Sequence, residues 1–77
     1  MKSFKDNIYI NRNIRSGQAC IKDTRITVAD ILGYLASGMT HKEIIDDFPE
    51  LENKDILSAL AFAAETQKRT STLETAA

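Results

Sequence analysis

The chain has 77 residues, 43% of them hydrophobic, and a formal net charge of −1. This length allows one domain with a small core, so dimerisation would add useful burial and we expect a homodimer. No apolar run approaches the roughly 18 residues of a membrane span, and the charged N-terminus lacks the apolar stretch of a signal peptide. A single cysteine cannot form an internal disulfide. These features predict a cytoplasmic protein without a membrane partner.

The charge is unevenly distributed along the chain. Residues 1–25 hold six basic and two acidic residues, a balance of +4, whereas residues 26–77 hold four basic and nine acidic residues, a balance of −5. Attraction for phosphate is therefore expected at the N-terminal end, while the segments that follow are acidic. Small domains also show uneven charge without any functional meaning, and both interpretations stay open.

Two short β-strands are predicted first. One ends the stretch 4–10 and places Ile8 and Ile10 on the same face. The other covers residues 19–21 and is reached through a turn in which Gly17 tolerates a positive φ. Residues 25–27 fit a third extended piece. Strands of this length are marginal alone, so they must pack on helices or pair with another chain.

A first helix is predicted from about residue 28 to residue 37. Thr27 is its expected N-cap, and Gly38 is its expected left-handed stop. Apolar residues recur at i, i+3, i+4 and i+7 and form one stripe, which consists of Val28, Ile31, Leu32 and Leu35.

A second and a third helix follow across a short break. The second begins with a capping box of Thr40 and Glu43, and it ends near residue 48 because Pro49 disfavours a helical residue before it. The third runs over residues 53–68, with a predicted core stripe of Ile56, Leu60, Ala63 and Ala64. Two short helices across a tight break have the outline of a helix-turn-helix.

The third helix carries apolar residues outside that stripe, which predicts a dimer or partner surface. We assign to this interface the following residues of the strands, the third helix and the tail: Ile8, Ile10, Leu57, Ala61, Phe62 and Leu73. The alternative is that small alanines lie harmlessly at the surface and that Phe62 fills an edge of the core. Residues 1–68 form the single predicted domain, with strands and arm over 1–27 and helices over 28–68. Residues 69–77 show no cap and no periodicity, which predicts a disordered tail.

Several segments, in this order along the chain, resemble one bacterial family: GQACIKDTRITV (17–28), LASGM (35–39), FPEL (48–51), DI (55–56) and ALAFA (59–63). Together they resemble family 433 of the domains of unknown function over roughly residues 8–65. The resemblance implies a mainly α fold, a three-helix homeodomain-like helix-turn-helix bundle with short N-terminal strands. It also implies an antitoxin of a type II toxin–antitoxin pair whose partner is a PIN-like ribonuclease.

Four positions depart from the family pattern. Gln18-Ala19 stands where Lys-Pro is usual, and Asp23 replaces a common glycine, which makes a left-handed turn there less comfortable. Glu52 replaces a usual threonine cap, and Phe62 replaces a usual tyrosine. The first three changes weaken the expected nucleic-acid surface and leave the expected fold unchanged.

Enzymatic chemistry is not expected. One histidine, His41, and one cysteine, Cys20, cannot form a metal cluster within one chain, and we predict no cofactor and no enzyme. His41 is expected to be a solvated residue of a first helical turn, and Cys20 a small packed hydrophobe. The carboxylates at 46, 47 and 50 are expected to form a solvated acidic face.

Two functions remain. The first is neutralisation of the toxin, for which the acidic helices could mimic phosphate in a basic ribonuclease cleft. The second is binding to operator DNA, by which an antitoxin would regulate itself. For this we assign as DNA contacts Arg12, Arg15, Lys22, Arg25, Lys42, Asn53, Lys54 and Ser58. The alternatives are a small helix-turn-helix regulator and a dimeric interaction scaffold, each without a toxin.

Overall fold

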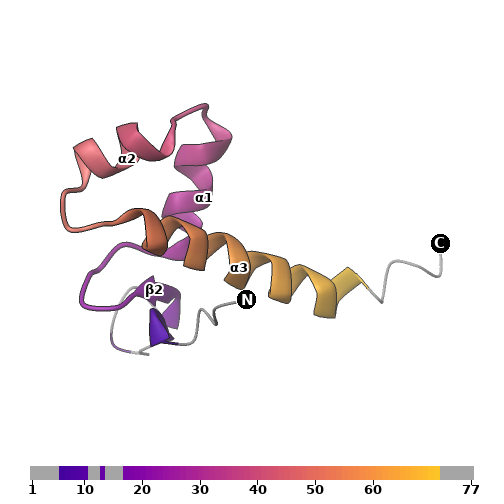
Figure 1. Cartoon of the computed structure of the whole chain (residues 1–77). Helices are drawn as coiled ribbons and strands as arrows, with labels where there is room; N and C mark the ends of the chain where they lie inside the picture. Colours follow the sequence, from indigo (N-terminus) through magenta and orange to yellow (C-terminus); the bar gives the residue numbers. More distant parts are fainter. Residues whose placement is uncertain (1–5, 11–12, 14–16, 72–77) are drawn as a thin grey trace.

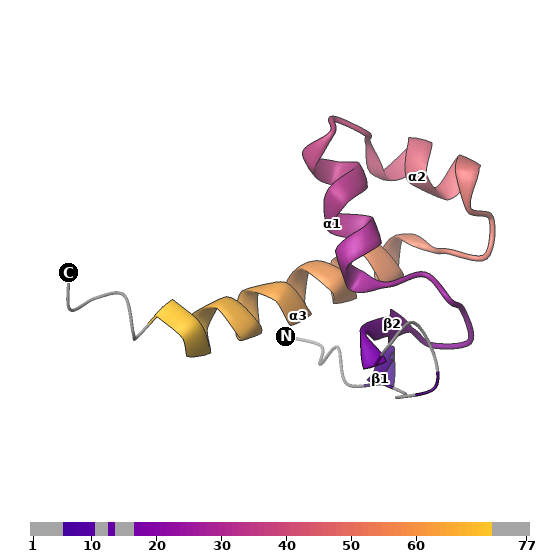
Figure 2. The ribbon, with the colours of Figure 1, turned by 180° about the vertical axis from the view of Figure 1, so that it is seen from behind.

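The computed structural model describes residues 6–10, 13 and 17–71, with side chains up to residue 68. The fold is mainly α with one small sheet, as predicted. Figure 1 shows helices and strands in this order: β1 (Ile8–Ile10), β2 (Ala19–Ile21), α1 (Val28–Ala36), α2 (His41–Asp47) and α3 (Asn53–Ser71). In both views α2 lies on one side of α3 and the sheet lies on the other, so α3 is the central element (Figures 1 and 2).

The predicted strands are confirmed and pair antiparallel, with Ile8 opposite Ile21 and Ile10 opposite Ala19. The expected third extended piece is reduced to one isolated bridge between Cys20 and Thr27. The turn after β2 contains Asp23 with a φ of 65°, in the left-handed region that asparagine and aspartate tolerate better than most residues.

Local capping sets the starts of α1 and α2. The Thr27 side chain accepts a hydrogen bond from the Asp30 N–H at 2.9 Å, and the Asp30 carboxylate accepts one from the Thr27 N–H at 3.2 Å. Thr40 and Glu43 form the same reciprocal pair at 3.1 and 2.8 Å. Both predicted caps are therefore confirmed, because a capping box needs only residues three positions apart.

The ends of α1 and α2 also follow the sequence. Gly38 directly follows Ser37, the C-cap of α1, and has a φ of 99°, so the predicted left-handed stop is confirmed. α2 ends at residue 47, two positions before Pro49. Beyond it, Phe48 stacks on Tyr34 of α1 with ring centroids 5.1 Å apart, which fixes the end of α2 against α1.

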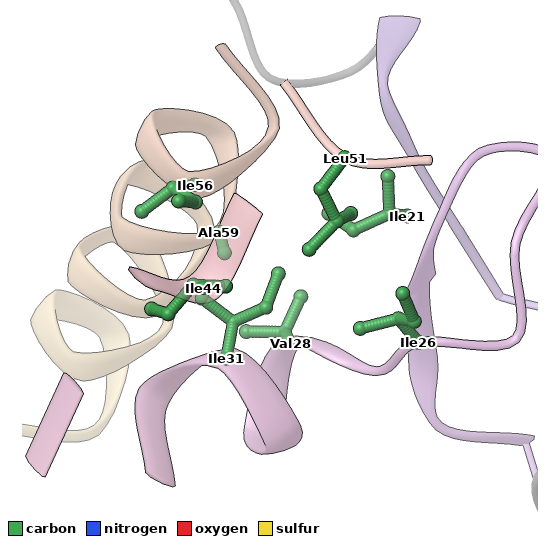
Figure 3. Close-up of a cluster of buried hydrophobic side chains, with 8 residues drawn as sticks. All are labelled: Ile21, Ile26, Val28, Ile31, Ile44, Leu51, Ile56 and Ala59. Carbon is green, nitrogen blue, oxygen red and sulfur yellow. The ribbon is translucent and has the colours of Figure 1, made fainter. Parts of the chain in front are cut away.

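The core collects side chains from every layer. Figure 3 shows aliphatic residues from the sheet region, the helices and the loop before α3 converging on one cluster, which consists of Ile21, Ile26, Val28, Ile31, Ile44, Leu51, Ile56 and Ala59. Cys20 is fully buried beside them, as expected of a packed hydrophobe.

The predicted core stripe of α3 is partly wrong. Leu60 remains 37% exposed and Ala64 is exposed, whereas Ala59 is fully buried. At about 100° per residue, Ala59 and Leu60 flank Ile56 on opposite sides. The helix therefore turns its Ala59 side toward the core, and Leu60 is left at the edge of the surface. This rotation creates a second apolar face on α3.

α3 is also longer than predicted, since it continues to Ser71 rather than ending near residue 68. Its C-terminal half projects away from the body in both views (Figures 1 and 2). Residues 72–77 of the predicted tail lie outside the described part of the chain.

Candidate functional site

A groove runs between α1 and the second half of α3, next to β2. Its volume is about 370 Å³. Three polar residues, Gln18, Thr66 and Gln67, contribute to its lining. The remaining lining residues are apolar: Ala19, Val28, Ala29, Leu32, Phe62 and Ala63.

The groove exists because small side chains separate larger ones. Ala29 and Ala63 leave space between α1 and α3, which larger residues at these positions would fill. Phe62 packs against the core, as one of its two interpretations expected, and it also lines the groove. Its place at an interface stays a prediction. Apolar surface of this kind, with a few polar groups, is typical of sites that accept side chains of a partner.

A second surface is acidic. Asp46, Asp47 and Glu50 are exposed at the end of α2 and in the loop that follows, as the sequence predicted. Lys42 lies 3.2 Å from Asp46, one turn away on α2, and both side chains are largely exposed. Residues 41–54 hold five acidic and two basic residues, a balance of −3. This face would attract a basic partner and repel phosphate.

The proposed base readers at the start of α3 are engaged within the chain. The Asn53 side-chain oxygen lies 2.7 Å from Nδ1 of His41, and the Ser58 hydroxyl accepts a hydrogen bond from Asn7 at 3.1 Å. Lys54 is exposed and lies 3.9 Å from Glu52. His41 is half-buried and bridges the starts of α2 and α3, a contact that the expectation of a solvated side chain did not include.

The basic residues predicted to contact phosphate do not gather at the start of α3. Lys22 and Arg25 are exposed in the segment after β2, and Lys42 is at the start of α2. Arg12 and Arg15 lie outside the described residues.

The predicted interface residues separate into three groups. Ile8 packs against the core from β1, while Ile10, at the other end of that strand, is 61% exposed. Leu57 is 51% exposed on α3 and Ala61 is half-buried. Phe62 lines the groove, and Leu73 lies outside the described residues.

A buried polar network holds β1 to the start of α3. Asp55 is 5% exposed, and its carboxylate accepts hydrogen bonds from the Asn7 side chain at 2.6 Å and from the Glu52 N–H at 2.7 Å. The Asn7 carbonyl accepts a further bond from the Lys22 N–H at 2.9 Å, so one residue links the sheet to α3. The spacing of three positions between Glu52 and Asp55 made their contact at the helix start predictable from the sequence. No sequence pattern indicated the contact between Asp55 and Asn7, which are 48 positions apart.

A polar cleft of about 430 Å³ surrounds this network, between the turn after β2 and the loop before α3. Carboxylates and two lysines line it, including Asp23, Glu50 and Lys54. Among the residues that the structure describes, no three His, Cys, Asp or Glu side chains are arranged to hold a metal ion. None of the helices in the described ranges is long and apolar enough to cross a membrane.

Comparison with known proteins identifies the family. The sequence profile of the family described as "Protein of unknown function (DUF433)" matches residues 8–63. The chain belongs to the DUF433 family. The matched range contains the core, the acidic face and most of the groove, whereas Thr66 and Gln67 follow it along α3.

A solved structure supports the assignment. The crystal structure of a DUF433 member protein from Anabaena variabilis ATCC 29413, at 2.00 Å resolution, is similar to this chain with a TM-score of 0.75 and 29% sequence identity. The similarity covers 95% of this chain and 71% of that one. A comparison with curated proteins found no match.

Proposed function

We propose that this DUF433 chain is an antitoxin that binds and neutralises a PIN-like ribonuclease. The groove between α1 and α3 carries the proposal, because it offers apolar surface to another protein at a place where the chain's own described residues leave space. The family resemblance supplies the class of partner. A helix or loop of the ribonuclease would place apolar side chains against Phe62 and Leu32.

The acidic face adds a second contact of suitable charge. A ribonuclease cleft that binds RNA is basic, and exposed carboxylates at Asp46, Asp47 and Glu50 can occupy it in place of phosphates. In this arrangement the groove supplies affinity, while the charges increase the association rate. Because salt screens these charges, the association rate should fall as the salt concentration rises.

The experiment is to measure ribonuclease inhibition by groove variants. The protein tested as partner is the product of the gene next to that of this chain, purified separately and assayed for cleavage of a fluorescent RNA. Ala29→Arg fills the groove with a charged side chain from an exposed helical position, and we expect at least about tenfold weaker inhibition. Ala36→Arg places the same side chain on an exposed position of the same helix outside the groove and is the matched control.

Two results would overturn the proposal. The first is a wild-type chain that neither binds nor inhibits the ribonuclease. The second is inhibition that Ala29→Arg leaves unchanged. Circular dichroism of each variant shows that any loss of inhibition does not come from unfolding.

Operator binding is the alternative function. Two features support it: α2 and α3 follow one another with the outline of a helix-turn-helix, and Lys22 and Arg25 are exposed. The intramolecular contacts of Asn53 and Ser58, however, leave fewer side chains for reading bases. Fluorescence anisotropy with upstream and scrambled DNA separates the cases. Operator binding requires tighter binding to the upstream DNA and a steep loss of affinity with salt. Equal affinity for both duplexes would exclude a sequence-specific regulator.

A further inference from the structure

An apolar patch lies on the outer side of α3, away from the groove. We call it the Leu57 patch, and it consists of Leu57 and Ala61, which are four positions apart and therefore neighbours on the helix surface. Leu57 is 51% exposed and Ala61 is half-buried, so the described part of the chain leaves much of the patch open. Leu57 and Phe62 stand about 140° apart around the helix axis, which separates the patch from the groove.

Asn7 holds the segment before β1 close to this patch. Its side-chain amide donates hydrogen bonds to the Asp55 carboxylate at 2.6 Å and to the Ser58 hydroxyl at 3.1 Å. Ser58 precedes Ala61 by three positions, so the β-carbons of these two residues are about 5–6 Å apart. The chain is therefore fixed to α3 about one helical turn from the Leu57 patch.

The residues that precede the described range are long enough to reach the patch. Residues 1–5 have the sequence MKSFK, in which Phe4 is the single aromatic residue. Phe4 is three positions from Asn7, so their Cα atoms are at most about 11 Å apart. This span extends from Asn7 past Ser58 to Ala61, and the phenyl ring extends the reach towards Leu57.

Two described surfaces near Asn7 differ in their chemistry. One is the polar cleft, which Asp6 lines together with Asp23 and Glu50. A phenyl ring placed there would take charged groups out of water without pairing them, which costs free energy. The other is the Leu57 patch, where the ring removes apolar surface from water on both sides of the contact. The apolar patch is therefore the favoured site for Phe4.

The charge of the segment also suits this side of α3. Residues 1–5 hold two lysines and no acidic residue. Glu65 is exposed and lies one turn beyond Ala61 on the same side of the helix. A segment that runs from Asn7 along α3 brings Lys2 towards this carboxylate. Exposed ion pairs contribute at most about 1 kcal/mol, so the apolar contact of Phe4 remains the main interaction.

We infer that residues 1–5 pack on the outer side of α3, with the Phe4 ring against Leu57 and Ala61. The contact is formed within one chain and requires neither a ribonuclease nor DNA. It does not rest on the proposed function, because the groove on the other side of α3 stays open. A protein that binds the Leu57 patch would have to displace this segment first, so residues 1–5 control access to the patch.

The first test is NMR spectroscopy of the purified chain, residues 1–77. Uniformly labelled protein should show nuclear Overhauser effects between the Phe4 ring protons and the methyl protons of Leu57 and Ala61. In a mixture of labelled and unlabelled chains, an experiment that selects contacts between different copies should not show them. Absence of these effects in the labelled protein, or their presence between different copies, would overturn the inference.

The second test is a double-mutant cycle followed by urea unfolding. Phe4→Ala and Leu57→Ala each remove one side of the contact, so their combined effect on the equilibrium constant of unfolding should fall short of the product by about threefold or more. Ile10→Ala is the matched control, because it removes another exposed aliphatic side chain, at the end of β1 away from Asn7. Its effect should multiply with that of Phe4→Ala. A strictly multiplicative effect of Phe4→Ala and Leu57→Ala would contradict the contact.

Discussion

Replacing Asp55 by alanine should destabilise the protein more than any other exchange of a charged side chain in its described part. The carboxylate is buried and accepts two hydrogen bonds, one from Asn7 across the fold and one from the Glu52 N–H at the start of α3. A lost capping bond costs about 1 kcal/mol, and a lost hydrogen bond to a charged group costs about 1.5–3 kcal/mol. The expected loss is therefore about 3 kcal/mol.

This loss is large for a chain of this size. A domain of 77 residues has a free energy of unfolding of roughly 4–12 kcal/mol, so Asp55→Ala would remove a substantial fraction of it. At roughly 4–8 °C per kcal/mol, the Tm should fall by about 12–24 °C. Urea and thermal unfolding, followed by circular dichroism at the helix band, measure both quantities.

A control and a double-mutant cycle test the reasoning itself. Asp47→Ala removes an exposed carboxylate and should change stability by less than about 0.5 kcal/mol. Asn7→Ala should cost less than Asp55→Ala because the Glu52 N–H bond survives, and the two losses should be less than additive by about 1 kcal/mol or more. A loss below about 1 kcal/mol for Asp55→Ala, or strictly additive losses, would refute the importance of this network.

Three backbone predictions can be checked in the same unfolding experiment. Gly33→Ala should stabilise the chain by about 0.5–1 kcal/mol, since a Cβ there has open space within a helix. Gly38→Ala should destabilise it by about 1–2 kcal/mol because its φ is 99°; shifts of the same sign for the two glycines would contradict this. Asp23→Val should cost about 1–2 kcal/mol, because a β-branched residue is strained at a φ of 65°. An unchanged Tm for this variant would show that the turn adjusts freely.

Local signals in the sequence predicted much of the fold correctly. The capping boxes at Thr27 and Thr40 need partners only three positions away, and Gly38 and Pro49 act on their immediate neighbours. Helix starts and ends therefore follow from contacts between residues that are close together in the sequence. The strands were also predictable, because two short runs of residues with high β-propensity are joined through a turn in which Gly17 tolerates a positive φ.

The contacts that join the elements were not predictable in this way. The rotation of α3 depends on the shape left between α1 and α2, so the sequence pattern alone could not separate Ala59 from Leu60 as the core residue. The Asn7–Asp55 bond and the Tyr34–Phe48 stack join distant segments, and no spacing rule indicates them. The groove required three elements to be placed together. The sequence indicated Phe62 as a candidate interface residue only because this residue made α3 apolar on too many sides.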